Sequence, residues 1–358
     1  MSTAREQSKK DVGANLSRSP GPQVSVIIVN YNSGERLKKC VRRLNEQTYQ
    51  NFNVCIIDNA STDGSLDFLG DTEASVIVIK SCENMGFAAA NNKAAAQVKG
   101  DWLAFLNPDA YAEPDWLEAF VTATARYPDV DAFGSTQLDA ANLDQLDGAG
   151  DCCSAYGIPY RGGFGWPATT VCGDTETFAA CAAAAFYRRQ TFIDLGGFDE
   201  RFFCYGEDVD LGYRLRLMGG RTIQLASARV AHEGSGVSGR RSDFTIYHGH
   251  RNRIWLFYKN TPLILYVLTA PLRLIADILL LLKHMVSGGG GAYIRAVRDG
   301  YLGLHKFNQD RNEMNSRGRS MSIGRLIVWS PAAVLRRKTK SRPVIESNRA
   351  ALFAQNAP

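Results

Sequence analysis

Three acidic residues, Glu207, Asp208 and Asp210, fall within four positions in the segment Tyr-Gly-Glu-Asp-Val-Asp-Leu. A helical pattern begins there and runs to Met218, and the dipole of a helix favours acids in its first turn. Capping of the helix is therefore one interpretation. The other is acid–base catalysis, because the dipole lowers the pKa of a carboxylate while crowding by other carboxylates raises it. One acid can then lie near the pKa that a general base needs, and we favour catalysis.

A further carboxylate, Asp109, follows the apolar run 103–106 and the pair Asn107-Pro108. Pro108 has no N–H for a strand ladder, which leaves Asp109 just beyond the carboxyl end of a strand, where open α/β sheets bind ligands. A carboxylate there can hold a divalent cation that in turn holds a pyrophosphate. His232, at the end of another strand, is a candidate second ligand for Mg²⁺ or Mn²⁺. The alternatives are plain turn chemistry for Asn-Pro-Asp and a structural histidine.

The elements that must position these residues alternate between strand and helix patterns, which indicates a parallel sheet with right-handed crossovers. Residues 30–34 lack the G-x-G-x-x-G pattern of dinucleotide-binding domains, so a cation on Asp109 is a candidate for neutralising phosphate. A short helix is expected after the polar turn 59–64, and a longer one from Pro114 to about residue 126. The strands expected in this half of the chain are 24–32, 53–58, 75–80 and 103–106.

The middle of the chain, 131–181, breaks into short strands, glycine-rich turns and aromatic residues. A buried strand or tightly packed segment is expected at 178–186, and a short helix at 187–195 that Gly196-Gly197 would end. The acidic helix ends at Gly219-Gly220, and a further strand covers 223–230.

The chain has 358 residues, 45% hydrophobic content and a net charge of +5, which suits one large domain or one domain with an appendage. Its eight cysteines include no C-x-x-C pair, a pattern typical of reduced thiols in a cytosolic protein. Residues 1–23 are polar and lack the apolar core of a signal peptide, so we expect a disordered leader. Basic residues crowd 336–342, which favours contact with nucleic acid or with an anionic membrane.

Four motifs occur in an order that is similar to one protein family. They are Val-Asn-Tyr-Asn at 29–32, Asp-Asn-Ala-Ser-Thr-Asp-Gly-Ser at 58–65, Asn-Pro-Asp at 107–109, and Gly-Gly-Phe-Asp-Glu with Tyr-Gly-Glu-Asp-Val-Asp-Leu within 196–211. Through them, residues 24–260 resemble the inverting glycosyltransferases of family 2, in the bacterial rhamnosyltransferase-like branch. The resemblance implies an α/β fold of GT-A type, a nucleotide-binding mixed sheet flanked by helices. Residues 261–358 would form a membrane-associated helical extension.

The resemblance also implies roles for single residues. It makes Asp208 the catalytic base, and Asp109 and His232 the ligands of a divalent cation, Mg²⁺ or Mn²⁺. Asn107 stands where the family has the first acid of its D-x-D motif, so the cation would have one carboxylate fewer. Asp210 lies roughly 200° around the helix from Asp208 and should face away from the acceptor. The residues implied at the donor nucleotide and its sugar are Asn30, Asn32, Asp58, Asn84, Gly86, Asn91 and Asn107.

The segment 262–286 is the most apolar part of the chain, but its uncharged run, 263–272, is too short to span a bilayer. We expect a helix that lies in or on the membrane interface. A spanning helix with a buried Arg273–Asp277 pair is the alternative. The candidate contacts for the acceptor or its diphosphate are Glu207, Trp166, Arg251 and Arg253. For the two arginines, membrane headgroups or a solvated helix face are equally open.

Transfer of a sugar is the function that the resemblance implies. The donor would be a nucleoside diphosphate sugar, with dTDP-L-rhamnose favoured, and the acceptor a lipid-linked or polysaccharide hydroxyl in cell-envelope glycan synthesis. The enzyme would work at the cytoplasmic face of the bacterial inner membrane, in peripheral or monotopic contact with anionic lipid and without nucleic acid. The alternative is a non-catalytic protein that has kept the nucleotide-sugar fold and binds membrane or nucleic acid through its basic tail.

Overall fold

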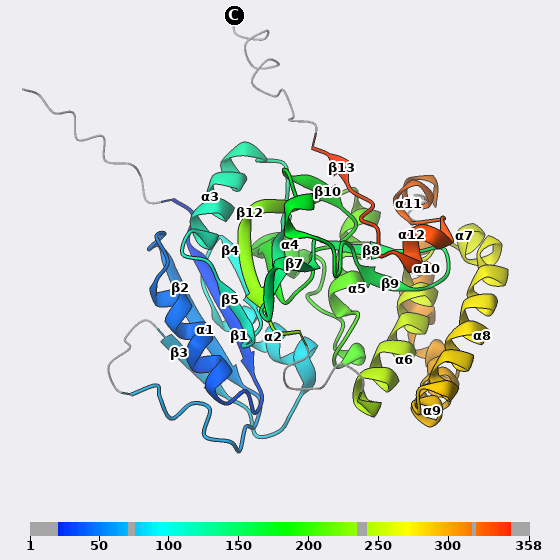
Figure 1. Ribbon diagram of the computed structural model, residues 1–358, viewed down its shortest axis with the longest axis horizontal. Coiled ribbons are helices and arrows are strands. Elements are labelled where there is room, and N and C mark those ends of the chain that lie inside the picture. The colour runs from blue at the N-terminus through cyan, green and yellow to red at the C-terminus, as the bar shows by residue number, and fades with distance from the viewer. Residues whose placement is uncertain (1–20, 71–75, 235–241, 317–319, 345–358) are drawn as a thin grey trace, which may run out of the picture.

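The computed structural model describes residues 21–70, 76–234, 242–316 and 320–344. Figure 1 shows a twisted sheet with helices on both faces and a second group of helices stacked beside it. The expected leader falls almost entirely outside the described residues. Ser75, at the start of an expected strand, and residues 345–358 also lie outside them.

Four parallel strands form one half of the main sheet, in the order β3-β2-β1-β4. β-branched residues predicted the first three and an apolar run predicted β4, and the side chains of β1 and β4 are buried on both faces. Because the strands are parallel, their carboxyl ends meet at one edge of the sheet. The strands are β1 Val24–Asn30, β2 Phe52–Asp58, β3 Val76–Lys80 and β4 Trp102–Leu106.

The other half of the sheet makes it mixed, because β11 (Ala184–Arg188) runs antiparallel between β4 and β6 (Ala132–Asp139). The long strand β12 (Thr222–His232) then pairs in parallel with β6. This arrangement confirms the expected mixed sheet. The remaining strands are β5 Ala110–Ala112, β7 Asn142–Gly148, β8 Asp151–Cys153, β9 Pro159–Arg161, β10 Thr175–Thr177 and β13 Arg342–Pro343.

Two layers of helices cover the sheet, each packed on its own apolar cluster. Helices α1 (Glu35–Asn45) and α3 (Trp116–Arg126) cover one face. The other face is covered by α2 (Gly86–Gln97), α4 (Arg189–Asp194) and α5 (Glu207–Met218). The predicted bounds of α5 are confirmed, and Gly219 ends it in the left-handed conformation, with φ of 93°.

Two expected elements differ from the structure. The polar turn after β2 leads into further turns and not into a short helix, because Asp67 and Leu69 donate to carbonyls only three residues back. Tyr187 belongs to the strand β11, where it pairs with Ala132 and Leu103, so the following helix begins only at Arg189. Pairing with distant strands outweighed the local helical pattern in this segment.

The C-terminal helices stack beside the sheet (Figure 1). The last described strand, β13, returns to pair with β10 at the edge of the main sheet. Among the described residues, no helix is long and apolar enough to cross a membrane. These helices are α6 Asp243–Asn260, α7 Leu263–Leu268, α8 Ala270–Val286, α9 Gly290–Leu302, α10 Asn308–Ser316, α11 Ser320–Leu326 and α12 Pro331–Leu335. Single 3₁₀ turns occupy Ala168–Thr170, Glu200–Phe202 and Gly303–Phe307.

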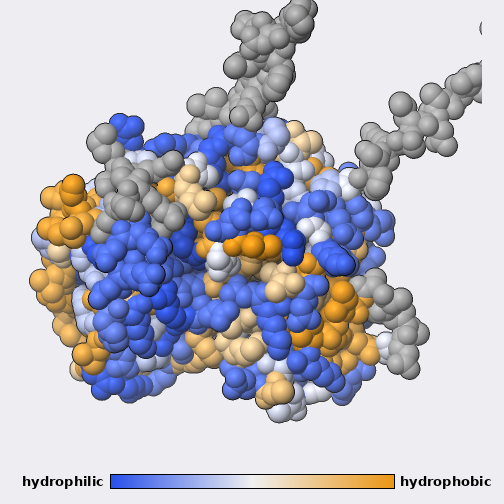
Figure 2. All heavy atoms as spheres, turned by 180° about the vertical axis from the view of Figure 1, so that it is seen from behind, coloured by the Kyte–Doolittle hydropathy of each residue, from blue (hydrophilic) through white to orange (hydrophobic). Residues whose placement is uncertain are grey.

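Helices α7 and α8 leave a broad apolar surface uncovered, which we call the α7–α8 face. Figure 2 shows apolar side chains gathered along the edge of the molecule that these helices form. Asp277 on α8 pairs with Arg253 on α6 and not with Arg273, so the Arg273–Asp277 pair of the alternative interpretation is wrong. The α7–α8 face consists of Leu263, Ile264, Val267, Leu268, Leu274, Ile275, Ile278, Leu279, Leu282, Met285 and Val286, each at least half exposed.

Candidate functional site

The carboxyl ends of β1 and β2 bring Asn30 and Asp58 together as register partners. The Nδ2 amide of Asn30 donates to Oδ1 of Asp58 at 2.9 Å and to Oγ of Ser65 at 2.8 Å. Asn30 is fully buried, whereas Asp58 keeps 7% of its surface exposed. Asn32, with φ of 49°, accepts from the backbone N–H of Thr62 at 2.8 Å. These bonds orient Asp58 at the edge where α/β sheets bind nucleotides.

The loop before α2 is shaped by Asn84 and Gly86. Oδ1 of Asn84 accepts from the amide of Asn59 at 2.8 Å and from the N–H of Gly86 at 3.0 Å. Gly86 has φ of 81°, and a Cβ there would lie 2.5 Å from the ring of Phe203, so only glycine fits. The buried Asn91 donates to the carbonyl of Phe87 one turn earlier in the same helix. Asn91 therefore stabilises α2 and is not among the described residues that line a pocket.

Asp109 and His232 meet at the junction of β4, β5 and β12. Nε2 of His232 lies 3.4 Å from Oδ1 of Asp109, and both side chains are buried, with 1% and 7% exposure. Nε2 makes no hydrogen bond although it is fully buried. Nδ1 of the same ring lies 2.7 Å from Oδ2 of Asp147. Burial opposes a charge on the ring, but the carboxylates of Asp109 and Asp147 outweigh it and raise the pKa of His232.

The environment of Nε2 of His232 shows whether these residues fit a divalent cation. An imidazole nitrogen without a hydrogen-bond partner faces a carboxylate oxygen in a buried place, and these are ligand types that Mn²⁺ and Mg²⁺ accept. The pair therefore fits the predicted cation.

A pocket of about 250 Å³ opens beside this pair, between the start of α5 and the β8–β9 hairpin. Asn107, two residues before Asp109, lies in its wall and links the two places. Four ionisable side chains line the pocket, and they are Asp151, Arg161, Glu207 and Asp208. Asp109 and His232 do not line it themselves, so the predicted cation ligands lie next to the pocket of the predicted base and are joined to it through Asn107.

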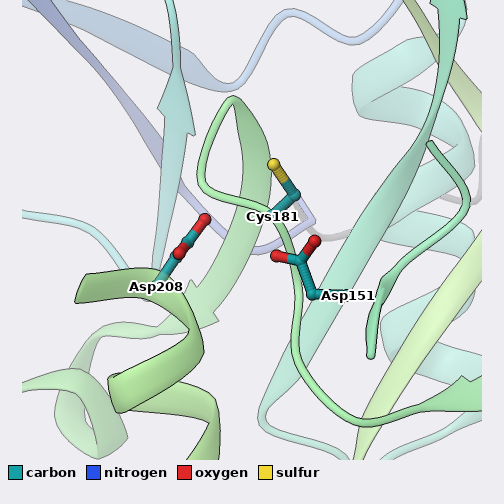
Figure 3. A group of neighbouring side chains, drawn as sticks. All are labelled: Asp151, Cys181 and Asp208. Carbon is teal, nitrogen blue, oxygen red and sulfur yellow. The ribbon is translucent and has the colours of Figure 1, made fainter. Parts of the chain in front are cut away.

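Asp208 shares this pocket with Asp151 and Cys181, whose side chains point toward one another in Figure 3. A carboxylate oxygen of each acid and the sulfur of Cys181 lie within 4.8 Å of one another. Burial raises the pKa of Asp208, but the N–H groups of Ala182 and Val209, which donate at 3.1 and 2.8 Å, lower it again. Burial and the charge of Asp208 hold the pKa of Asp151 well above its usual range. The backbone N–H groups therefore favour the charged form of Asp208 over that of Asp151.

Glu207 also lies in the wall of this pocket, but with a different environment. It is 5% exposed, and its Oε2 has no hydrogen-bond partner. Burial and the charge of Asp208 hold its pKa well above the usual range. A carboxyl that keeps its proton can donate a hydrogen bond to a bound hydroxyl, which suits the predicted contact with an acceptor.

Asp210 points away from the pocket, as predicted. Its carboxylate accepts from Arg214 at 2.8 Å, from Lys259 at 3.0 Å and from Asn260 at 2.7 Å. These cations lower its pKa although it is fully buried. Asp210 therefore anchors α5 to α6 and holds the first turn of α5, where Asp208 lies.

Comparison with known proteins identifies the family. Residues 25–196 match the family described as glycosyl transferase family 2. The N-acetylglucosaminyl-diphospho-decaprenol L-rhamnosyltransferase of Mycobacterium tuberculosis is 30% identical over 244 residues, which cover 60% of this chain and 77% of that protein. The chain belongs to glycosyltransferase family 2.

Other relatives of this glycosyltransferase differ from it in length. The O-antigen biosynthesis protein RfbC of Myxococcus xanthus is 33% identical over 231 residues, which cover 62% of this chain but only 18% of that protein. The crystal structure of GalNAc-T7 with UDP, GalNAc and Mn²⁺ aligns with a TM-score of 0.54 at 17% identity, over 66% of this chain and 48% of that one. The mannosyltransferase PcManGT from Pyrobaculum calidifontis, in complex with GDP-Man and Mn²⁺, aligns with a TM-score of 0.50 at 18% identity, over 85% of this chain and 86% of that one. These likenesses confirm the GT-A fold.

Three of the predicted acceptor contacts of this glycosyltransferase lie away from the acid pocket. Trp166 donates through Nε1 to the carbonyl of Arg336 and packs on a small apolar cluster under β7. Arg251 stacks on the ring of Trp255 at 4.1 Å, and the buried Arg253 pairs with Asp277. Within the described residues, none of the three lines the pocket. The arginines hold α6 against its neighbours, which is a structural role.

Sequence reasoning missed the buried acids Asp147 and Asp151 and the half-buried Arg161, which add ionisable groups to the site. Arg161 donates to Asp147 and also lies in the wall of the acid pocket, so it joins the predicted cation pair to the acids of the pocket. The available signal was weak. Asp147 and Asp151 flank the run Gly148-Ala149-Gly150 in a segment of short strands, where acids usually face solvent.

Proposed function

We propose that this glycosyltransferase moves a sugar, with inversion at the anomeric carbon, from a nucleoside diphosphate to a hydroxyl of an acceptor. The observation that carries the proposal is that Asp109 and His232 lie next to a pocket that holds Asp208, with Asn107 and Arg161 between them. A binding module has no need of an ionised carboxylate in a pocket next to a cation site. The nucleotide would occupy the edge near Asp58, with Asn30, Asn32, Asn84 and Gly86 shaping its walls.

The favoured donor is dTDP-L-rhamnose, and the favoured acceptor is a lipid-linked glycan diphosphate. The rhamnosyltransferase from Mycobacterium tuberculosis supports both through its name, which specifies an N-acetylglucosaminyl-diphospho-decaprenol acceptor. The O-antigen protein from Myxococcus xanthus supports synthesis of a cell-envelope polysaccharide. Asp58 is suited to accept from the N3–H that thymine and uracil share.

Asp208 acts as the base in this proposal. Its carboxylate lines the pocket and accepts from backbone N–H groups that favour its charged form, so it can take the proton of an acceptor hydroxyl as the new glycosidic bond forms. General base catalysis of this kind contributes about 10²–10⁴-fold to the rate. Glu207, in the same wall, would hold a neighbouring hydroxyl and orient the acceptor.

The departing nucleoside diphosphate gains negative charge as the sugar leaves. Asp109 and His232 would hold the divalent cation, Mg²⁺ or Mn²⁺, that supplies positive charge to that diphosphate. Two structural neighbours that were crystallised with Mn²⁺ support this proposal. Asn107 occupies the position of a missing carboxylate, so we expect weaker cation binding than in a site with two acids.

We further propose that the α7–α8 face rests on an anionic membrane, so that the enzyme acts at the cytoplasmic face of the bacterial inner membrane. Eleven large apolar side chains on two neighbouring helices are at least half exposed there, and the exposed Lys283 lies on α8 between Leu282 and Met285. Apolar area together with nearby basic charge is what binds a helix to an anionic interface. Residues 24–260 would form the catalytic domain, and 261–358 the membrane-directed region.

The β8–β9 hairpin connects this face with the acid pocket. Pro159 and Tyr160 line the pocket, while Gly157 lies close to the side chain of Arg273 on α8. We propose that a lipid-linked acceptor approaches Asp208 from the side of α8, and the contact of this hairpin with both places supports that direction.

The proposal is tested by measuring sugar transfer with purified full-length protein. The donors are dTDP-rhamnose, UDP-glucose and GDP-mannose, and the acceptor is N-acetylglucosaminyl-diphospho-polyprenol in vesicles, with Mn²⁺ or with EDTA. We expect a disaccharide-linked lipid from dTDP-rhamnose that EDTA suppresses. Absence of product from every donor would contradict transferase activity on this acceptor, and product from another donor would contradict rhamnose alone.

A further inference from the structure

The histidine predicted to bind the cation is held by a second carboxylate from a distant part of the chain. Nδ1 of His232 lies 2.7 Å from Oδ2 of Asp147, and 85 residues separate the two. Both side chains are only 1% exposed. From this contact we infer that Asp147 is a positioning residue that fixes the tautomer of His232 and thereby creates the cation site. The inference rests on the proposed function, because it concerns the cation of that same site.

The charges around the ring determine where its proton lies. Arg161 donates to Oδ2 of Asp147, so the oxygen that faces Nδ1 is a hydrogen-bond acceptor. Nη1 of Arg161 also approaches Nδ1, but at 3.4 Å, whereas Oδ2 of Asp147 lies at 2.7 Å. The shorter contact decides, and its hydrogen belongs to Nδ1. In the neutral ring, Nε2 then carries a lone pair and no hydrogen.

That lone pair points to the predicted cation. Nε2 has no hydrogen-bond partner and lies 3.4 Å from Oδ1 of Asp109. A histidine with a purely structural role would satisfy both ring nitrogens, because buried polar atoms are nearly always hydrogen-bonded. Metal-binding histidines, in contrast, commonly donate their other nitrogen to a carboxylate that orients the ring. The pattern around His232 is the second of these.

Asp147 reaches His232 through the pairing of strands. It lies on β7, which pairs with β6, and β6 pairs with the strand β12 that ends at His232. The neighbouring acid Asp139 is the register partner of His232, but its carboxylate accepts from the backbone of Ala141. Asp139 therefore supplies a matched control, because it carries the same charge nearby without contacting the ring.

The first test measures binding of Mn²⁺ alone to full-length protein, by the loss of the electron paramagnetic resonance signal of the free ion. We expect Asp147→Asn to weaken binding about 10–100-fold, as is typical for carboxylates behind a metal-bound histidine. Asp139→Asn should leave the affinity within a factor of about two. Asp109→Asn, which removes a proposed ligand, should weaken binding at least as strongly as Asp147→Asn.

These variants separate the inference from the proposed function. Loss of binding in Asp109→Asn with full binding in Asp147→Asn would overturn the role of Asp147 and leave the cation site intact. Unchanged binding in both variants, or no binding by the unaltered protein, would overturn the inference together with the proposed cation site.

The second test needs no stable variant of Asp147. The chain has five histidines, so ¹⁵N labelling of histidine alone gives a small set of ring signals, and His232→Gln identifies the one required. At a pH where the ring is neutral and without metal, we expect Nδ1 of His232 to carry the hydrogen. If Nε2 carries it in the unaltered protein, the inference is wrong.

Discussion

Asp208 lies in the first turn of α5 and faces Asp151 on β8. A carboxylate oxygen of each acid and the sulfur of Cys181 lie within 4.8 Å of one another. Two negative charges so close together repel each other strongly where water does not screen them, so ionisation of both acids is unfavourable. Two backbone N–H groups donate to Asp208, so Asp208 is the stronger acid. The pair therefore sets the pKa values of two neighbouring carboxyl groups apart, which is the arrangement that acid–base catalysis uses.

The pH dependence of sugar transfer should report this environment. Burial raises the pKa of Asp208, so activity should rise with pH through a value above that of an ordinary aspartate. Arg161 lowers the pKa of Asp208, and Arg161→Gln should therefore move the acid limb of kcat/KM to higher pH. Arg161→Lys, which keeps the charge, is the control and should move the limb less. A limb that Arg161→Gln leaves in place, or moves to lower pH, would contradict the proposed interaction.

Asp151 should make folding stability depend on pH. Its pKa is raised in the folded state, so its contribution is fully present below the pKa of the unfolded chain and is lost as pH rises through the folded pKa. Asp151→Asn, which resembles the protonated acid, should therefore stabilise the protein more at pH 8 than at pH 5. Urea unfolding at both values measures the difference. Equal effects at the two values would show that Asp151 is not held protonated.

Asp210 should matter for stability and not for proton transfer. Its removal would leave the buried cations Arg214 and Lys259 without their shared carboxylate, so Asp210→Ala should cost about 3–5 kcal/mol in the free energy of unfolding. Urea titration followed by circular dichroism measures this. The exposed pair of Arg43 and Glu46 gives a control, since Glu46→Ala should cost less than about 1 kcal/mol. Similar costs for both variants would contradict the anchoring role of Asp210.

Binding to membranes tests the α7–α8 face. Replacing Ile275 and Leu279 by serine should weaken sedimentation with vesicles that contain phosphatidylglycerol by about tenfold or more, because apolar burial drives such binding. Ile77→Ser removes an equally exposed apolar side chain from β3 and should have no effect. Lys283→Gln should weaken binding only to anionic vesicles. Full binding by the double variant would show that this face does not contact lipid.

Local patterns predicted much of the fold. Runs of β-branched residues located three of the parallel strands, and the apolar run before Pro108 located the fourth. The acids of the first turn with Gly219 located both ends of α5. Local patterns failed where pairing with a residue far away in the sequence determines the secondary structure. Tyr187, for example, pairs within the sheet although its neighbours favour a helix.

The site shows the same division. Asp109, His232 and Asp208 carried recognisable motifs, whereas Asp147 gains its role only from strand pairing that brings it to a ring 85 residues away. Arg253 resembled a surface cation in sequence, but its partner Asp277 lies on another helix. Neither contact can be predicted from the spacing of residues along the chain.

The most direct test of the account is sugar transfer by Asp208→Asn under single-turnover conditions, with donor and acceptor saturating. The amide preserves shape but cannot take a proton, so we predict that the rate falls about 10²–10⁴-fold while binding of the donor nucleotide stays unchanged. Asp194→Asn, an exposed acid at the end of α4, should transfer at the normal rate. Transfer by Asp208→Asn at the rate of the unaltered enzyme would contradict the role of Asp208 as the base.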